Sequence, residues 1–82
     1  MSVIDARGLR CPLPVLRLAR VARHAAPGTE LELWATDPAA TPDVAAWARM
    51  RGHEFLGAQP LADDDGDPQA AVVVRVRVLG ST

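Results

Sequence analysis

The chain has 82 residues, of which 49% are apolar and 23% charged, and its nine basic and ten acidic side chains give a formal net charge of −1. This composition is typical of a globular protein, and the length predicts a single domain over residues 1–82 with a core one layer thick. A doubly wound sheet or a barrel around a deep cofactor is excluded by size. The near-zero charge gives no whole-molecule attraction to nucleic acid or to an anionic membrane.

The N-terminal half of the chain predicts a strand, a helix and a second strand. Residues 3–6 form a short strand candidate. Residues 12–26 have a helical period, and Pro12 suits the first helical position, so Cys11 is expected at the N-cap. Residues 30–36 alternate between apolar and polar side chains, as in a half-buried strand. The expected core-facing residues of the helix are Val15, Leu18, Ala19, Ala22 and Ala25 or Ala26.

The C-terminal half predicts a second helix and two more strands. Thr41 is the expected N-cap of the helix and Gly52 its end, with Val44, Trp47 and Ala48 on the apolar face. Residues 53–59 form a weaker strand and residues 71–79 a strong one rich in valine. The acidic patch over residues 63–68 predicts a solvated turn and does not fit the EF-hand pattern for calcium.

The order strand, helix, strand, helix, strand, strand predicts an α/β (α+β) two-layer sandwich with both helices on one face of the sheet. Two glutamates of the second strand point away from the helices, and so do two arginines of the last strand. If these strands are neighbours, we expect the charges to pair across them. The residues concerned are Glu30, Glu32, Arg75 and Arg77.

Cys11 is the one cysteine, which excludes an internal disulfide, a Cys-x-x-Cys redox pair and a cysteine-built zinc site. We therefore expect no metal and no cofactor. A helix N-terminus and the nearby Arg7 and Arg10 would favour the reactive thiolate. Pro12 and Pro14 remove N–H donors from the first turn but hold the sulfur on a rigid turn. The alternative interpretation is a small buried apolar residue without a chemical role.

A cysteine hydrolase requires a general base beside the thiol, and neither histidine is well placed for that role. His24 lies more than two helical turns from Cys11, and His53 is expected to be a structural hydrogen-bonding residue after the second helix. Asp37 is expected to cap a turn. It can also lie near Cys11, because loops that leave parallel strands share one edge of a sheet. There it would raise the pKa of the thiol or steer a sulfur donor.

Residues 5–14, Asp-Ala-Arg-Gly-Leu-Arg-Cys-Pro-Leu-Pro, resemble the Cys-Pro-x-Pro signature of the TusA/SirA-like sulfur-carrier family. Residues 37–40, Asp43, Trp47 and residues 52–54 are similar to the second-helix pattern of that family. The resemblance covers residues 4–78. It implies a two-layer sandwich with a mixed four-stranded sheet.

The resemblance also implies a function. Members of the family are sulfurtransferases that accept sulfane sulfur as a persulfide, here on Cys11, from a cysteine desulfurase or a rhodanese-like donor. They then pass the sulfur to a downstream acceptor protein in tRNA thiolation, molybdenum-cofactor synthesis or sulfur oxidation. We expect a monomer when free, with no direct binding of nucleic acid.

Two features bear on the choice of partner. Leu13 stands between the prolines, where an acidic residue is common in members that act in tRNA thiolation, and we interpret it as a partner contact or as packing on a loop. The basic face of Arg17, Arg20 and Arg23 resembles a docking surface for acidic partners, although solvated charged faces are common. The alternative function is a non-catalytic interaction or regulatory module in which Cys11 is incidental.

The compartment is predicted from what the sequence lacks. A small fold without disulfides fits a reducing compartment. No basic segment followed by an apolar stretch begins the chain, and the apolar runs are far shorter than the ~20 residues of a membrane span. We therefore expect a cytoplasmic protein.

Overall fold

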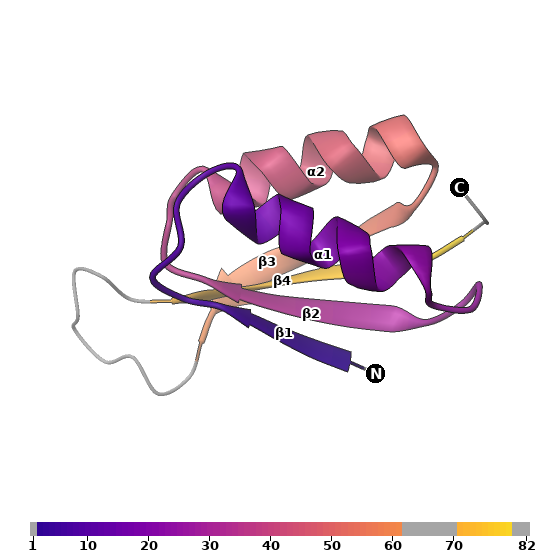
Figure 1. Ribbon diagram of the computed structural model, residues 1–82, viewed down its shortest axis with the longest axis horizontal. Coiled ribbons are helices and arrows are strands. Elements are labelled where there is room, and N and C mark those ends of the chain that lie inside the picture. Colours follow the sequence, from indigo (N-terminus) through magenta and orange to yellow (C-terminus); the bar gives the residue numbers. More distant parts are fainter. Residues whose placement is uncertain (1, 62–70, 80–82) are drawn as a thin grey trace.

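The computed structural model describes residues 2–61 and 71–79, so the acidic patch at residues 63–68 and its expected turn lie outside the described residues. The elements follow the predicted order along the chain (Figure 1). They are β1 (Ser2–Ala6), α1 (Leu13–Arg23), β2 (Glu30–Ala35), α2 (Ala40–Arg51), β3 (Glu54–Pro60) and β4 (Val72–Arg77).

The four strands form one mixed sheet in the order β1-β2-β4-β3. β1 pairs with β2 in parallel, and β4 pairs antiparallel with both β2 and β3. Both helices lie on the same face of this sheet (Figure 1). The structure therefore confirms the predicted two-layer α+β sandwich.

The core lies between the sheet and the two helices and is built from alternate strand residues and one face of each helix. The alternation predicted for residues 30–36 and 71–79 is confirmed, because one face of β2 and of β4 packs against the helices and is buried. Val73 is buried as well, although the alternation places it on the face of Arg75 and Arg77. In α1, Leu18 and Ala22 are buried as expected, and Val15 packs partly buried against the core. The buried cluster comprises Ile4, Ala6, Leu18, Ala22, Leu31, Leu33, Val44, Ala48, Val74, Val76 and Val78.

The opposite face of the sheet carries the predicted pairs of opposite charge. Glu30 lies opposite Arg77 and Glu32 opposite Arg75 in the register of β2 and β4. The guanidinium of Arg77 is 3.1 Å from Glu30, and that of Arg75 is 3.9 Å from Glu32. Arg77 also reaches Glu54 on β3, at 2.8 Å. Both arginines are therefore paired with glutamates of neighbouring strands in the sheet.

The structure corrects the beginnings of both helices. α1 begins at Leu13 with Pro12 as N-cap, because the N–H of Leu13 donates to the carbonyl of Arg10 in a turn that precedes the helix. Cys11 therefore lies one residue before the N-cap instead of occupying it. α2 begins at Ala40, not after a Thr41 cap, because a turn at Asp37 starts the helix earlier.

The helix ends also differ from the prediction in part. α1 ends at Arg23 and not near residue 26, because the next two N–H groups bond carbonyls three residues back and tighten the chain into turns. The end of α2 is as predicted. Gly52 adopts a left-handed conformation with φ of 77°, which glycine tolerates without steric cost.

Candidate functional site

The candidate site is formed by the two loops that leave the parallel strands β1 and β2 and lead into α1 and α2. The carboxyl ends of β1 and β2 and the beginnings of both helices lie at one end of the molecule (Figure 1). Gly8, with φ of 84°, makes the turn after β1, and its N–H donates to Oγ1 of Thr36 at 2.9 Å. This hydrogen bond joins the two loops beside the site.

Asp37 fixes the backbone of both loops. Its Oδ2 accepts the N–H of Cys11 at 2.6 Å, and its Oδ1 accepts the N–H of Ala39 at 2.9 Å. These hydrogen bonds, first that from Ala39 and then that from Cys11, lower the pKa of Asp37, and the charge of Arg10 adds to the effect. Asp37 thus caps its own turn and also lies beside Cys11, so both predicted placements are present together.

The thiol of Cys11 is exposed and faces a second carboxylate. Its Sγ donates a hydrogen bond to Oδ2 of Asp43 at 2.7 Å. The hydrogen bond to Asp43 is the largest cause of a raised Cys11 pKa, followed by desolvation and by the negative charges of Asp43 and Asp37. The expected stabilisation of the thiolate is therefore not found in this structure, because the neighbouring carboxylates raise the pKa of the Cys11 thiol.

The two arginines expected to favour the thiolate are engaged elsewhere. Arg7 forms a two-pronged hydrogen bond with Asp5, at 2.9 and 2.8 Å, and its guanidinium lies 5.1 Å from the ring centroid of Trp34. Arg10 acts on Asp37, whose pKa it lowers. Within the part of the chain that the structure describes, the groups that shift the pKa of Cys11 are carboxylates and neither arginine is among them.

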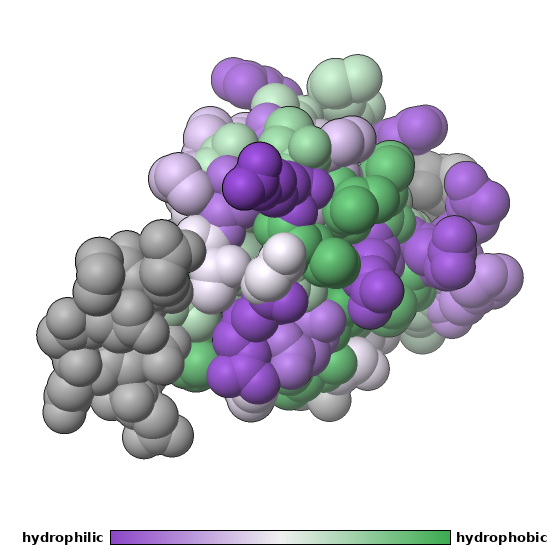
Figure 2. Space-filling model, turned by 60° about the vertical axis from the view of Figure 1, so that its left-hand side comes forward, coloured by the Kyte–Doolittle hydropathy of each residue, from purple (hydrophilic) through white to green (hydrophobic). Residues whose placement is uncertain are grey.

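An exposed groove extends from the site along α1 and β1. Leu13 and Leu16 are 49% and 55% exposed, which is high for leucine, and Arg17 and Arg20 lie beside them. Pro12 is exposed, whereas Pro14 is fully buried and anchors the first turn of α1. Figure 2 brings this end of the molecule forward and shows hydrophobic side chains interleaved with hydrophilic ones. The expected contact residue Leu13 therefore lies on the surface next to Cys11.

Sequence reasoning missed Asp43 as a partner of the thiol. Asp43 lies in the first turn of α2, where the helix dipole alone is enough to favour a carboxylate. The shared edge of parallel strands, which led to Asp37, also brings the beginning of α2 to Cys11. That argument could have found Asp43 too.

Neither histidine contacts Cys11. His53 is buried, and its Nδ1 accepts the N–H of Leu79 at 3.2 Å, which confirms the expected structural role. Desolvation, with a smaller contribution from Arg51, lowers the pKa of His53. His24 is exposed at the end of α1. A histidine base of the kind used by cysteine hydrolases is thus not provided by the described residues.

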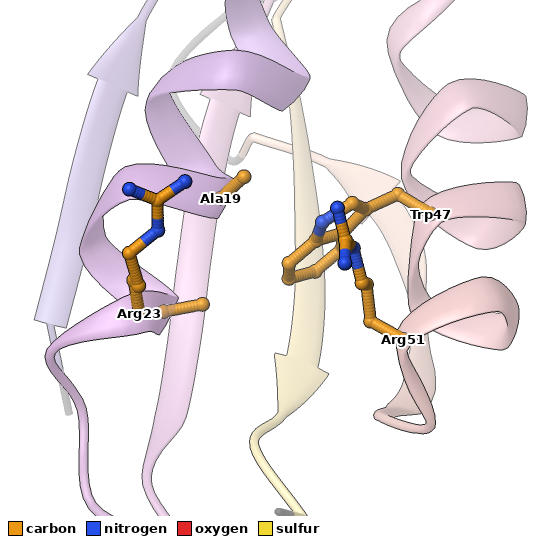
Figure 3. Close-up of a pocket in the computed structure, with 5 residues that line it drawn as sticks. Ala19, Arg23, Trp47 and Arg51 are labelled. Atoms are coloured by element: carbon orange, nitrogen blue, oxygen red, sulfur yellow. The ribbon is translucent and has the colours of Figure 1, made fainter. Parts of the chain in front are cut away.

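A second hollow, of about 140 Å³, lies between the far ends of the helices. Its walls come from α1 and α2, with the indole of Trp47 directed into the space between the helices (Figure 3). Its lining residues on α1 begin at Ala19 and end at Arg23, so along the helix axis they lie roughly 9 to 15 Å from Leu13, where the helix begins. No nucleophile lines it. Its lining residues are Ala19, Ala22, Arg23, Trp47 and Arg51.

The described residues offer neither a metal centre nor a membrane span. No group of three or more histidine, cysteine, aspartate or glutamate residues within residues 2–61 and 71–79 is arranged to hold a metal ion. No helix in the same ranges is both long enough and apolar enough to cross a membrane.

Comparisons with known proteins agree on one family. The family model described as sulfurtransferase TusA matches residues 2–75. The chain is 41% identical over 61 residues to the sulfur carrier protein TusA of Pseudomonas entomophila, covering 74% of this chain and 76% of that protein. It is 38% identical over 66 residues to the putative sulfur carrier protein YrkI of Bacillus subtilis, covering 80% and 83%.

Two further matches differ in how much of the matched protein they cover. The putative sulfur carrier protein YrkF of Bacillus subtilis is 42% identical over 57 residues, but these make up 70% of this chain and 31% of YrkF, so the chain spans about a third of that relative. The crystal structure of a SirA-like protein from Desulfitobacterium hafniense superposes with a TM-score of 0.71 over 98% of this chain and all of that one. At 22% identity, this likeness supports the fold alone.

Proposed function

The chain belongs to the TusA family of sulfurtransferases, whose relatives here are sulfur carriers, and on this premise we propose that it carries sulfane sulfur as a persulfide on Cys11. The observation that carries the proposal is that the thiol of Cys11 is exposed just before the N-terminus of α1. Cys11 is the cysteine of the Cys-Pro-Leu-Pro sequence. The hydrogen bond from the Cys11 N–H to Asp37 holds this thiol at the surface, where a partner protein can reach it.

Loading is a thiol exchange that needs no oxidant. The Cys11 sulfur, as thiolate, attacks the outer sulfur of a donor persulfide, R–S–SH. A bond forms between Sγ and the sulfane sulfur, the S–S bond of the donor breaks, and the donor thiolate leaves with the electron pair and takes up the proton lost by Cys11. The products are R–SH and Cys11–S–SH. In a second exchange, the thiolate of an acceptor attacks the outer sulfur of Cys11–S–SH and Cys11 leaves as the thiolate. An external acceptor is required because this chain has no other cysteine to release the sulfur as a disulfide.

The proposed donor is a cysteine desulfurase or a rhodanese-like protein, and the proposed acceptor is a further protein of a sulfur relay. The relays to test are those of tRNA thiolation, molybdenum-cofactor synthesis and sulfur oxidation. We assign this carriage to a single domain over residues 1–82, monomeric when free and working in the cytoplasm, where thiols are kept reduced.

The groove beside Cys11 is the proposed docking surface for these proteins. Leu13 and Leu16 provide exposed apolar contacts next to the thiol, and Arg17 and Arg20 provide positive charge. α1 contains no acidic residue, and the ion pairs within the described residues do not include its arginines. A partner with an acidic rim around an apolar patch would therefore be complementary to this surface.

The test is the intact mass of the purified, reduced protein after incubation with a cysteine desulfurase and L-cysteine, and separately with a rhodanese and thiosulfate. We expect a gain of one sulfur atom that dithiothreitol removes and that Cys11→Ser prevents. Absence of the adduct with both donors would refute persulfide carriage and favour the interaction module. A Cys11→Ser variant that still accepts sulfur would refute the assignment to Cys11.

A further inference from the structure

The sulfur of Cys11 is flanked by carboxylates, an unusual setting for a cysteine that has to react. We propose that Asp43 retains the carried sulfur: it slows the loss of sulfane sulfur from Cys11 to small thiols, so that release waits for a docked acceptor protein. This inference rests on the proposed function and names the residue that makes the carriage selective.

Asp43 is the carboxylate that acts on the sulfur itself. Its Oδ2 lies 2.7 Å from Sγ of Cys11 and accepts the thiol hydrogen. Asp37 has a different role, because its two oxygens are each occupied by a backbone N–H, from Cys11 and from Ala39. Asp37 therefore fixes the loop, and Asp43 sets the electrostatic environment of the sulfur.

The retention follows from the chemistry of release. An attacking thiolate forms a bond to the outer sulfur of Cys11–S–SH, and the bond between that sulfur and Sγ breaks. The electron pair returns to Sγ, so negative charge develops on the atom that Asp43 contacts, and the resulting thiolate then takes up a proton. Like charges at such a distance repel strongly at a protein surface. Thiols with a higher pKa leave more slowly, and Asp43 raises the pKa of Cys11.

The approach of small thiolates is also opposed. The attacking species is an anion, and both Asp37 and Asp43 lie beside the sulfur that it has to reach. An acceptor protein that docks on the groove gains contacts with Leu13 and Arg17, which a small thiol lacks. Those contacts can supply the free energy that offsets the repulsion. The carboxylates therefore discriminate between docked and undocked acceptors.

The same contact protects the empty carrier. Oxidation and alkylation of cysteine proceed through the thiolate, and the hydrogen bond to Asp43 keeps Cys11 as a thiol. The raised pKa also lowers the fraction of Cys11 that is present as thiolate, which slows loading. This slowing is partly offset because thiolates of higher pKa are intrinsically better nucleophiles.

The test measures how fast a loaded carrier loses its sulfur. Wild type, Asp43→Asn and Asp5→Asn are loaded with a cysteine desulfurase and L-cysteine, or with inorganic polysulfide if a variant does not accept sulfur from the enzyme. After removal of the donor, dithiothreitol or glutathione is added and the persulfide is followed by intact mass. Asp5→Asn is the matched control, because it removes an aspartate charge that is bonded to Arg7 instead of the thiol.

We expect Asp43→Asn to discharge several-fold faster than wild type, and Asp5→Asn to match wild type. The acceleration is about threefold for each unit by which the Cys11 pKa falls, if release is as sensitive to the pKa as attack is. The discharge rate should rise more with glutathione, whose thiolate form carries additional negative charge from its carboxylates, than with dithiothreitol, whose thiolate form carries none. Equal or slower discharge from Asp43→Asn would overturn the inference.

A second readout separates this role from a loss of structure. The rate of alkylation by iodoacetamide is measured against pH, and its midpoint should shift downward in Asp43→Asn and stay unchanged in Asp5→Asn. Asp43→Glu, which keeps the charge, should lie between wild type and Asp43→Asn, and it replaces Asp43→Asn if circular dichroism shows that the latter is unfolded. An unshifted midpoint would refute the electrostatic role. Wild type that gains no sulfur would overturn the proposed function as well, whereas a loaded wild type with unselective discharge overturns only this inference.

Discussion

The two ends of the helix layer carry opposite charges. Where α1 and α2 begin, Asp37 and Asp43 surround the thiol of Cys11. Toward the helix ends, Arg23 and Arg51 line the same hollow as Trp47 (Figure 3). Acidic residues near helix N-termini and basic residues near C-termini are favoured by the helix dipole in any protein. Charge at a helix end therefore does not by itself mark a site, and what distinguishes the acidic end is the nucleophile in contact with it.

The two ends also differ in how they are held together. At the acidic end, hydrogen bonds join Cys11 to residues 26 and 32 positions away in the sequence. At the basic end the rings of Trp47 and His53 pack with their centroids 5.1 Å apart, and a long-range hydrogen bond from the N–H of Leu79 to His53 involves no nucleophile. We therefore expect substitutions at the acidic end to change the chemistry of the thiol, and those at the basic end to change stability.

The largest expected effect on stability is that of Trp47→Ala. The indole packs partly buried against the core, and removing a large aromatic side chain costs about 3 kcal/mol in the free energy of unfolding. Met50→Ala, at a residue that is 80% exposed, is the matched control and should change it by less than about 0.5 kcal/mol. Urea denaturation measures both. A large change in the alkylation rate of Cys11 in Trp47→Ala would break the distinction between the two ends.

A smaller loss is expected from Asp37→Asn, measured as the melting temperature. The substitution weakens the charge-assisted acceptor of two backbone N–H groups. Because folding lowers the pKa of Asp37, its contribution is present above the unfolded value and is lost as the pH falls through the folded value. The difference between variant and wild type should thus shrink in acid. Arg23→Gln, at the other end, should leave the melting temperature nearly unchanged, and an equal loss there would contradict the comparison.

His53 should make stability depend on pH near neutrality. Burial lowers the pKa of His53 in the folded state, so the unfolded chain binds the proton more tightly. The free energy of unfolding should therefore decrease as the pH falls from 7.5 to 5.5, through the unfolded value of 6.5. His53→Asn should reduce this dependence. A flat profile in wild type would show that His53 is not desolvated.

The smallest effect is that of Arg51→Gln on the titration of His53. The charge of Arg51 is the second cause of the lowered pKa, after desolvation, so its removal should move the pKa of His53 upward without restoring the ordinary value. Nuclear magnetic resonance of the imidazole follows the titration directly. Arg49→Gln, which removes the same charge from a residue that is not among these causes, should leave the pKa of His53 in place.

Much of the fold could be predicted from the sequence because burial imposes periods on it. The alternation of Leu31 and Leu33 with Glu30 and Glu32 fixed the two faces of β2, and the valines of β4 did the same for that strand. These patterns depend only on which side of an element meets the core. The order of the elements and the position of Cys11 near the start of the first helix followed from such local rules. The pairing of the glutamates of β2 with the arginines of β4 required in addition that these two strands be neighbours.

Which of the nearby charged side chains contacts the sulfur was decided only by the tertiary structure. Arg7 lies four positions from Cys11 in the sequence, yet it is held by Asp5 and Trp34. Asp43 lies 32 positions away, yet it contacts the thiol. A side chain of either charge could have filled the space beside Sγ, and the choice depended on how the β2–α2 loop packs against the β1–α1 loop. The sequence by itself therefore determined where the thiol stands, and the packing of the two loops determined that it meets carboxylates, because side-chain contacts depend on distances of a few ångströms that no periodicity records.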